Sequence, residues 1–450
     1  MIRACLALVA LIIFPTAGLS QDTAIGERLR AYFEPLVETR DFSGVIAVRR
    51  GDELVAYERF GYADWETGAR FTPDSTFAVG SVTKSLTAGL VLQMSQDGQI
   101  DLDAPARRYL PDLDPAFTAS VADILHHRAG LPRDFPPGAL SDTRSQSVID
   151  WLNETQSFGP GPHPEAYSNV GYSVLAIIAE RAGHGRFETL ATMELLAPLG
   201  MTSSRLSREN AQPNVSGYSP GPLPLDLQPP MNLDPGFGAT GLVTTIDDLM
   251  RLADAVASRR LDLFQPDGSL IGSFSARTLA GETIYTIQGS VPGFSAGASA
   301  MPGRELTLAY ATNIESYSNW GIRDILHRLV LDQAVEPAPL RQASHELTDA
   351  HRALVGRYQT GAFGPAEISE TEAGLTLTLL GPGWIFYLTP QTDGAVLWRT
   401  FNIMLAPARN QLDEIIALNA RQSLLGQPEQ NTQWQRDMPP APEISEAGEP

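Results

Sequence analysis

Cysteine is almost absent from this 450-residue chain, which contains only Cys5. Cys5 lies in an apolar N-terminal segment that we expect to be removed, so the mature protein is predicted to hold no thiol. A chain without thiols has no disulfide, no cysteine-based zinc site and no cysteine nucleophile. Its length allows two or three domains and a large core, so it does not need disulfides for stability.

Positive charge is also scarce. The chain has 32 Lys and Arg against 52 Asp and Glu, which gives a formal net charge of −20 at pH 7. So acidic a protein is not an expected partner of nucleic acid or of anionic membrane surfaces. Charged residues make up only 19% of the chain, so the composition does not indicate disorder.

Lysine is the rarest basic residue. Lys84 is the only lysine, and every other basic residue is an arginine. A guanidinium stays protonated in proteins, whereas a buried ammonium can lose its proton. One interpretation is that this position requires a neutral amine. The alternative is that one lysine survived a compositional bias by chance.

Long apolar runs are confined to the N-terminus. Arg3 and the apolar run over residues 4–14 are typical of a signal peptide, and Ser20 is a small residue suited to cleavage before Gln21. The run is too short to span a bilayer, and no later segment resembles a transmembrane helix. We therefore expect residues 1–20 to be a signal peptide and the mature protein to be periplasmic or secreted.

The most informative motif is F-A-V-G-S-V-T-K at 77–84, in which Ser81 precedes Lys84 by three residues. Leucine and methionine side chains then recur at spacings of four, which predicts a helix that begins near Ser81. Backbone N–H groups in a first helical turn can stabilise an oxyanion. A neutral Lys84 on the same helix face could take the serine proton. Since an amine of pKa about 10.4 costs roughly 4–5 kcal/mol to neutralise at pH 7, the site must lower that pKa.

Two further candidates, Tyr167 and Asn169, precede a predicted helix over 170–183. A tyrosine hydroxyl beside a cation can be tuned toward phenolate and can relay a proton to a leaving group. An asparagine can orient Lys84 or hold a substrate carbonyl. The alternative is a strand-end tyrosine followed by a helix cap, which is a common arrangement.

Together these motifs resemble those of the serine β-lactamase-like and penicillin-binding superfamily, nearest to class C β-lactamases, D-aminopeptidases and family VIII carboxylesterases. The resemblance rests on F-A-V-G-S-V-T-K at 77–84, D-I-L-H-H-R-A-G-L-P at 123–132, Y-S-N-V-G-Y at 167–172, A-P-L-G-M-T at 197–202 and V-P-G-F-S at 291–295. It implies that Ser81 is the acylated nucleophile, with Lys84 and Tyr167 shuttling its proton. It also implies that Asn169 positions the substrate.

The third motif of that superfamily, Lys or His followed by a small residue and Gly, is altered. Counting back from P-G-F places Ile287-Gln288-Gly289 at this position, so only the glycine matches. An isoleucine cannot bind a substrate carboxylate, whereas Gln288 is a candidate for a neutral hydrogen bond. Gly289 would let the substrate approach the strand. The N–H of Ser290, with that of Ser81, would form the oxyanion hole.

Two other patterns suggest catalytic residues, and we interpret both as structural. G-F-S-A-G at 293–297 fits the nucleophile elbow of α/β hydrolases around Ser295, but that motif needs a following helix, which the sequence does not predict. His126 and His127 are adjacent on a predicted helix over 120–127, point in different directions and have no acidic ligand pattern beside them.

The order of the predicted elements indicates an α/β (α+β) fold. Strands are predicted at 44–49, at 54–60 and in three segments between 283 and 313, and helices lie between these groups. This order predicts an antiparallel sheet built from both ends of a hydrolase domain over 21–338, flanked by a helical region. Alternating residues predict a small β-barrel-like domain over 345–424, which resembles a lipocalin-like domain. The Gln-, Pro- and Glu-rich segment 425–450 is predicted to be disordered.

We therefore expect an exported serine hydrolase that forms an acyl-enzyme at Ser81 with a small ester or amide. The expected partner is a small-molecule or short-peptide substrate, with no metal and no organic cofactor. One alternative is a D-amino-acid or cell-wall peptidase, or a weak β-lactamase. Another is a non-catalytic ligand- or peptide-binding protein on the same fold. The sequence makes no prediction of the oligomeric state.

Overall fold

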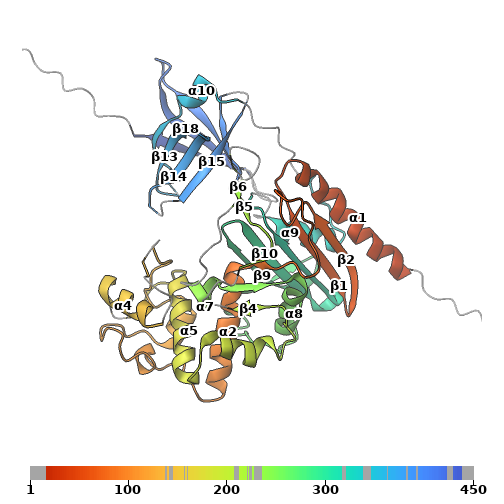
Figure 1. Cartoon of the computed structure of the whole chain (residues 1–450), viewed down its shortest axis with the longest axis vertical. Helices are drawn as coiled ribbons and strands as arrows, with labels where there is room; N and C mark the ends of the chain where they lie inside the picture. Colours follow the sequence, from red (N-terminus) through yellow and green to blue (C-terminus); the bar gives the residue numbers. More distant parts are fainter. Residues whose placement is uncertain are drawn as a thin grey trace, which may run out of the picture.

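The computed structural model describes residues 17–136, 139–140, 145–156, 158–159, 161–206, 212–219, 221, 226–227, 236–316, 321–337, 346–361, 363–381, 384–391, 394–422 and 429–437. Figure 1 shows a mixed α/β part and, beside it, a small all-β part formed by the C-terminal end of the chain. Most of the predicted signal peptide, residues 1–16, lies outside the described residues.

A six-stranded antiparallel sheet forms the centre of the larger part, in the order β2-β1-β11-β10-β9-β8. Its strands are β1 (Gly44–Arg50), β2 (Glu53–Phe60), β8 (Phe274–Leu279), β9 (Glu282–Val291), β10 (Phe294–Met301) and β11 (Leu306–Thr312). β1 pairs with β11 from Gly44 opposite Thr312 to Arg50 opposite Leu306. The predicted antiparallel sheet built from both chain ends is thus confirmed.

Helices cover both faces of this sheet (Figure 1). On one face, α1 (Ala17–Glu38) and α9 (Ile322–Val330) bury a first apolar core against the strands. On the other face lie α2 (Thr83–Gln96), α5 (Asn169–Gly183), α7 (Phe237–Thr240) and α8 (Ile246–Ala257), around a larger second core. Burying this much apolar surface provides the main stabilisation of the fold.

Shorter elements connect these layers. They are β3 (Phe77–Ala78), α3 (Val121–Leu125), α4 (Ser145–Thr155), α6 (Phe187–Ala191), β4 (Arg205–Leu206), β5 (Tyr218–Ser219), β6 (Asp226–Leu227) and β7 (Leu242–Thr244). A π-helical turn over Thr192–Leu196 continues α6. The sequence did not predict α1, β8 or α4. Pro35 lies inside α1, and a proline normally argues against a helix interior.

The C-terminal part is a closed eight-stranded antiparallel barrel. Its strands are β12 (Gly356–Gln359), β13 (Pro365–Thr371), β14 (Gly374–Leu379), β15 (Trp384–Pro390), β16 (Val396–Trp398), β17 (Ile403–Arg409), β18 (Ile415–Gln422) and β19 (Gln430–Arg436), with α10 (Asp349–Arg352) before them. Trp398, Trp434 and Tyr358 are buried in its interior. The barrel therefore encloses a packed core.

The prediction of a disordered tail over 425–450 is wrong for β19. This strand pairs with β18 on one side and β12 on the other, and so closes the barrel. Its polar side chains are largely exposed, whereas Trp434 is buried. A strand with one buried side chain among glutamines gives almost no apolar alternation, so its sequence resembles that of a disordered segment. Residues 438–450 lie outside the described residues.

A buried ion pair joins the barrel to the sheet part. Arg399 lies just after β16, and its guanidinium donates to the Asp41 carboxylate at 2.8 Å. The same nitrogen also donates to the backbone carbonyl of Thr39 at 3.1 Å. The Asp41 side chain is fully buried. The positive charge of Arg399 is therefore balanced by the Asp41 carboxylate, in the segment that precedes β1.

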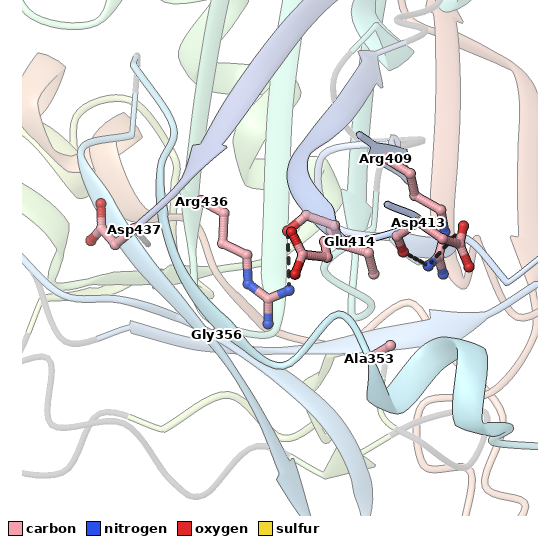
Figure 2. A pocket seen from close by; sticks show the side chains of 8 residues that line it. Ala353, Gly356, Arg409, Asp413, Glu414, Arg436 and Asp437 are labelled. Carbon is pink, nitrogen blue, oxygen red and sulfur yellow. Dashed lines mark hydrogen bonds and ion pairs between the residues drawn. The ribbon is translucent and has the colours of Figure 1, made fainter. Parts of the chain in front are cut away.

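One pocket, of about 460 Å³, lies on the barrel (Figure 2). Its charged side chains are largely engaged with the barrel itself. Arg409 donates to the Asp413 carbonyl at 2.7 Å, and Arg436 donates to the Ile415 carbonyl at 3.3 Å. None of the lining residues belongs to an element near Ser81, so this pocket is not the candidate active site. Among the described residues, no helix is long and apolar enough to cross a membrane.

Candidate active site

Ser81 lies at the junction between the sheet and the helical region. A 3-10 turn over Gly80–Val82 leads directly into α2. Gly80 has a φ of +51°, and a side chain there would begin 2.4 Å from the carbonyl oxygen of Ser290 on β9. Only glycine fits this left-handed, crowded position. The predicted helix start is confirmed, and β9 fixes the turn that presents Ser81.

Lys84 lies one turn further along, with its side chain fully buried. Its Nζ lies 3.2 Å from the Ser81 Oγ, 2.5 Å from the Asn169 Oδ1 and 3.1 Å from the Ala239 carbonyl oxygen. Burial lowers the pKa of Lys84 to about 7; the Asp134 carboxylate opposes this change and the Arg133 guanidinium adds to it. A substantial fraction of this amine is therefore neutral near pH 7, which is the state a proton acceptor needs.

The Tyr167 hydroxyl is a second polar group in contact with the Ser81 hydroxyl. Its Oη lies 2.6 Å from the Ser81 Oγ, and its ring lies 4.8 Å from the Lys84 Nζ. The expectation that a nearby cation tunes this hydroxyl toward phenolate does not hold. Burial raises the pKa of Tyr167, although its hydrogen bond with Ser81 lowers it. Tyr167 is thus a neutral phenol at pH 7 that can both donate and accept a proton.

Asn169 is held in one orientation by its neighbours. Ser168 caps α5, accepting from the Gly171 N–H at 2.8 Å. The Asn169 Nδ2 donates to the Asp134 carboxylate, so its Oδ1 faces Lys84. Asp134 was not predicted from the sequence. Its position directly after L-P-R gave no periodic or motif signal, and only the fold brings it to Asn169.

A second residue missed from the sequence supports the serine turn. The Ser273 Oγ donates to the Ser81 carbonyl oxygen at 2.6 Å, and its N–H donates to the Ser85 Oγ at 3.1 Å. Ser273 immediately precedes β8, far from α2 in the sequence. These two hydrogen bonds attach the first turn of α2 to the sheet.

The adjacent histidines lie just after α3, which ends at Leu125, so the predicted helix over 120–127 is shorter than expected. His127 occupies a position that fits a structural interpretation. The Nδ1 of His127 accepts from the Ser168 N–H at 3.1 Å. Its ring packs 4.8 Å from the Tyr167 ring. Burial, followed by the charge of Lys84, lowers the pKa of His127 to about 4. A neutral His127 therefore supports the Tyr167 ring and the start of α5.

The altered third motif lies on β9, and its residues alternate between the two faces of the sheet. Ile287 is buried in the core beneath α2 and α8. A side chain on Gly289 would begin 2.7 Å from the Ser81 N, so this position faces the serine turn. Gln288 pairs with Gly297 on β10. A side chain added to Gly297 would meet the Tyr310 ring, which belongs to the core on the α1 and α9 face of the sheet. Gln288 thus lies on the face away from Ser81, which contradicts its prediction as a substrate contact.

The close approach of β9 also brings two backbone amides to one place. A side chain on Gly80 would begin 2.9 Å from the Ser290 N, and one on Gly289 would begin 2.7 Å from the Ser81 N. Both glycines are therefore needed where the strand crosses the turn. The arrangement brings the backbone nitrogens of Ser81 and Ser290 close to the point where the strand crosses the turn, and an oxyanion hole formed by their N–H groups stays a prediction.

Ser295 does not have the surroundings of a nucleophile elbow. It lies within β10, opposite Ser290, and its side chain is buried. After β10 the chain enters the short turn Pro302–Arg304 and then β11, so no helix follows the serine. Strand alternation places Ser295 on the same face as Ser299, which contacts His327 of α9. Within the described residues, no group of three or more His, Cys, Asp or Glu side chains could hold a metal ion.

The fold and this serine–lysine–tyrosine arrangement define a class of serine hydrolases that act through a serine near the start of a helix. A family model for beta-lactamases matches residues 29–332, and the chain belongs to this family. Members of this class are hydrolases that act on amides, peptides or β-lactams, so this protein is a serine hydrolase.

Individual relatives are distant. The chain is 27% identical over 353 residues to a penicillin-binding protein of Bacillus subtilis (strain 168), covering 71% of this chain and 76% of that protein. It is 29% identical over 220 residues to a D-aminopeptidase of Gluconobacter oxydans (strain 621H), covering 46% of this chain and 41% of that protein. A solved class C beta-lactamase shares the fold, with a TM-score of 0.58 and 19% identity over 71% of this chain and 98% of that chain.

Proposed function

We propose that the protein is an exported hydrolase that cleaves small esters or amides through an acyl-enzyme at Ser81. The observation that supports this most directly is the position of the Ser81 Oγ, 3.2 Å from the Lys84 Nζ and 2.6 Å from the Tyr167 Oη. Export rests on the signal-peptide pattern of residues 1–20.

In the first step, neutral Lys84 takes the Ser81 proton as the Oγ attacks the substrate carbonyl carbon. The amides of Ser81 and Ser290 stabilise the resulting oxyanion. Tyr167 then donates its proton to the leaving group and regains one from Lys84, so that the relay ends with Lys84 neutral and the carbon–leaving-group bond broken. Water hydrolyses the acyl-enzyme by the reverse transfer. Asn169 keeps Lys84 in place through its Oδ1.

The substrate class follows from Ile287. The buried isoleucine cannot supply the cation that the family's third motif uses for a carboxylate beside the scissile bond, so efficient β-lactam hydrolysis is not expected. The likeness to a D-aminopeptidase favours a D-amino-acid or short cell-wall peptide amide as the second candidate. A non-catalytic binding protein is the third candidate, and the retained Lys84 contacts argue against it.

The test is labelling of the full chain with a fluorophosphonate, followed by intact-mass measurement and peptide mapping. The proposal expects one adduct on Ser81, absent from Ser81→Ala, together with turnover of simple chromogenic esters. An adduct on Ser295 would overturn the assignment of the nucleophile. A folded protein that gives neither an adduct nor turnover would favour the non-catalytic candidate.

A further inference from the structure

Arg133 is fixed at the mouth of the site by its backbone. Its carbonyl oxygen accepts from the Asn169 N–H at 2.7 Å. The carbonyl of the preceding Pro132 accepts from the Ser168 Oγ at 2.6 Å. The backbone that carries Arg133 is thus attached directly to the Tyr167–Asn169 motif.

The side chain of Arg133 extends over Tyr167. Its guanidinium carbon lies 5.2 Å from the centre of the Tyr167 ring. The hydroxyl of that ring contacts the Ser81 Oγ at 2.6 Å. A substrate whose carbonyl carbon contacts Ser81 would therefore have neighbouring groups within reach of Arg133.

The guanidinium keeps donors available for a ligand. It forms an ion pair through its Nε with Asp134 at 3.3 Å, and its side chain is 66% exposed. Within the part of the chain that the structure describes, it makes no hydrogen bond besides this contact. Asp134 also accepts from Asn169, so it stays in place and restrains the Nε end of the fork. The two terminal nitrogens of such a fork match a carboxylate.

Arg133 supplies a positive charge at the site, whereas the third motif on β9 supplies none, because Ile287 is buried and uncharged. Resting on the proposed function, we propose that Arg133 binds a carboxylate on the substrate and so replaces the cation that the third motif lacks. The carboxylate would approach from the Tyr167 side of the serine, not from β9. The preferred substrates are therefore esters or amides that carry a carboxylate on either the acyl group or the leaving group.

Two pairs of chromogenic esters test this assignment and locate the carboxylate. Mono-p-nitrophenyl glutarate and p-nitrophenyl pentanoate differ in a charge on the acyl group. 4-Carboxyphenyl butyrate and 4-carbamoylphenyl butyrate differ in a charge on the leaving group. We expect Arg133→Gln, measured on the alkaline plateau of the rate profile where Lys84 is neutral in both proteins, to lower kcat/KM for the carboxylate ester of one pair by about fivefold or more, mainly through KM. The neutral ester of that pair should stay within about twofold on the same plateau, because the effect of the Arg133 charge on the pKa of Lys84 does not change the rate there. Arg133→Lys should restore part of the loss, since it keeps the charge without the fork.

Arg108→Gln is a matched control. Arg108 is also exposed, forms an ion pair with Asp101 at 3.2 Å and lies 5.9 Å from the Tyr109 ring, but it is not in the site. It should change none of the four rates. Equal loss for charged and neutral esters in Arg133→Gln, or no loss for any of them, would overturn the assignment while leaving the proposed function intact. Neutral-ester turnover that survives Ser81→Ala would instead overturn the proposed function, and this inference would fail with it.

Discussion

The Lys84 Nζ and the Asn169 Oδ1 lie 2.5 Å apart, and the other end of the Asn169 amide is held by Asp134. An asparagine anchored in this way presents an acceptor to the amine whether or not the amine carries an extra proton. The contact therefore positions Lys84 without requiring it to be charged. Because burial is the larger effect on its pKa, Lys84 can change protonation state during a catalytic cycle.

The first prediction concerns pH. In the proposed mechanism the active form of Lys84 is the neutral amine, and burial lowers its pKa to about 7. The kcat/KM for a neutral ester should therefore be low at pH 5 and rise through an apparent pKa near 7 to a plateau. A rate profile on p-nitrophenyl butyrate, with the fold checked at each pH, measures it. A flat profile between about pH 5.5 and 8.5 would contradict the assignment of Lys84 as the base.

The second prediction concerns the identity of the base. Lys84→Arg should be nearly as damaging as Lys84→Ala, with each lowering kcat by roughly 10²–10⁴-fold, because a guanidinium keeps its proton. Single-turnover acylation rates on a chromogenic ester measure the effect, and Ser81→Ala gives the background rate without the nucleophile. An arginine variant that kept most of the activity would show that only positive charge is needed at this position.

The third prediction separates Tyr167 from its neighbour Tyr172. Tyr167→Phe removes the proposed proton relay and should lower kcat roughly 10²-fold or more with little change in melting temperature. Tyr172→Phe is the control, because the Tyr172 Oη donates to the buried Leu125 carbonyl at 3.1 Å and does not contact Ser81. It should cost about 1–3 kcal/mol of stability and keep most of the activity. The reverse pattern would assign Tyr167 a purely structural role.

The fourth prediction concerns Asp134, whose negative charge raises the pKa of Lys84. Asp134→Asn keeps an acceptor for Asn169 but removes the charge. The apparent pKa of the rise in kcat/KM should therefore move to lower pH. Asp101→Asn, an exposed carboxylate outside the site, should leave the profile in place. A shift of the profile to higher pH would show that Asp134 acts on Lys84 in some other way.

The fifth prediction concerns the joint between the two parts. Arg399→Ala leaves the fully buried Asp41 without its cation and should destabilise the protein by about 3–5 kcal/mol. Arg352→Ala breaks exposed pairs with Asp349 and Glu370 and should cost no more than about 1 kcal/mol. Denaturant unfolding monitored by tryptophan fluorescence compares them. Equal losses would mean that the buried pair adds no stability beyond an exposed one.

The sequence was sufficient for the parts of this protein whose signals are local. The strands predicted at 44–49 and 54–60 and the helix after Ser81 depend on neighbouring residues, and the structure confirms each of them. The roles of Asp134 and Ser273 could not be predicted, because each contacts the site only after distant segments fold together. The prediction for Gln288 was wrong because alternation shows only that Gln288 and Gly289 lie on opposite faces of the strand. Which of the two faces meets Ser81 depends on how the sheet packs.

The pairing of β1 with β11 has a consequence for how the protein is made. The innermost strand of the N-terminal hairpin lacks one neighbour until Thr312 has been synthesised, and the Ser81 turn lacks its β9 support until Gly289 has followed. Such distant pairings fold slowly, since a long loop must close before they form. A chain that emerges from the ribosome therefore stays catalytically inert, with an open sheet edge, through most of its synthesis.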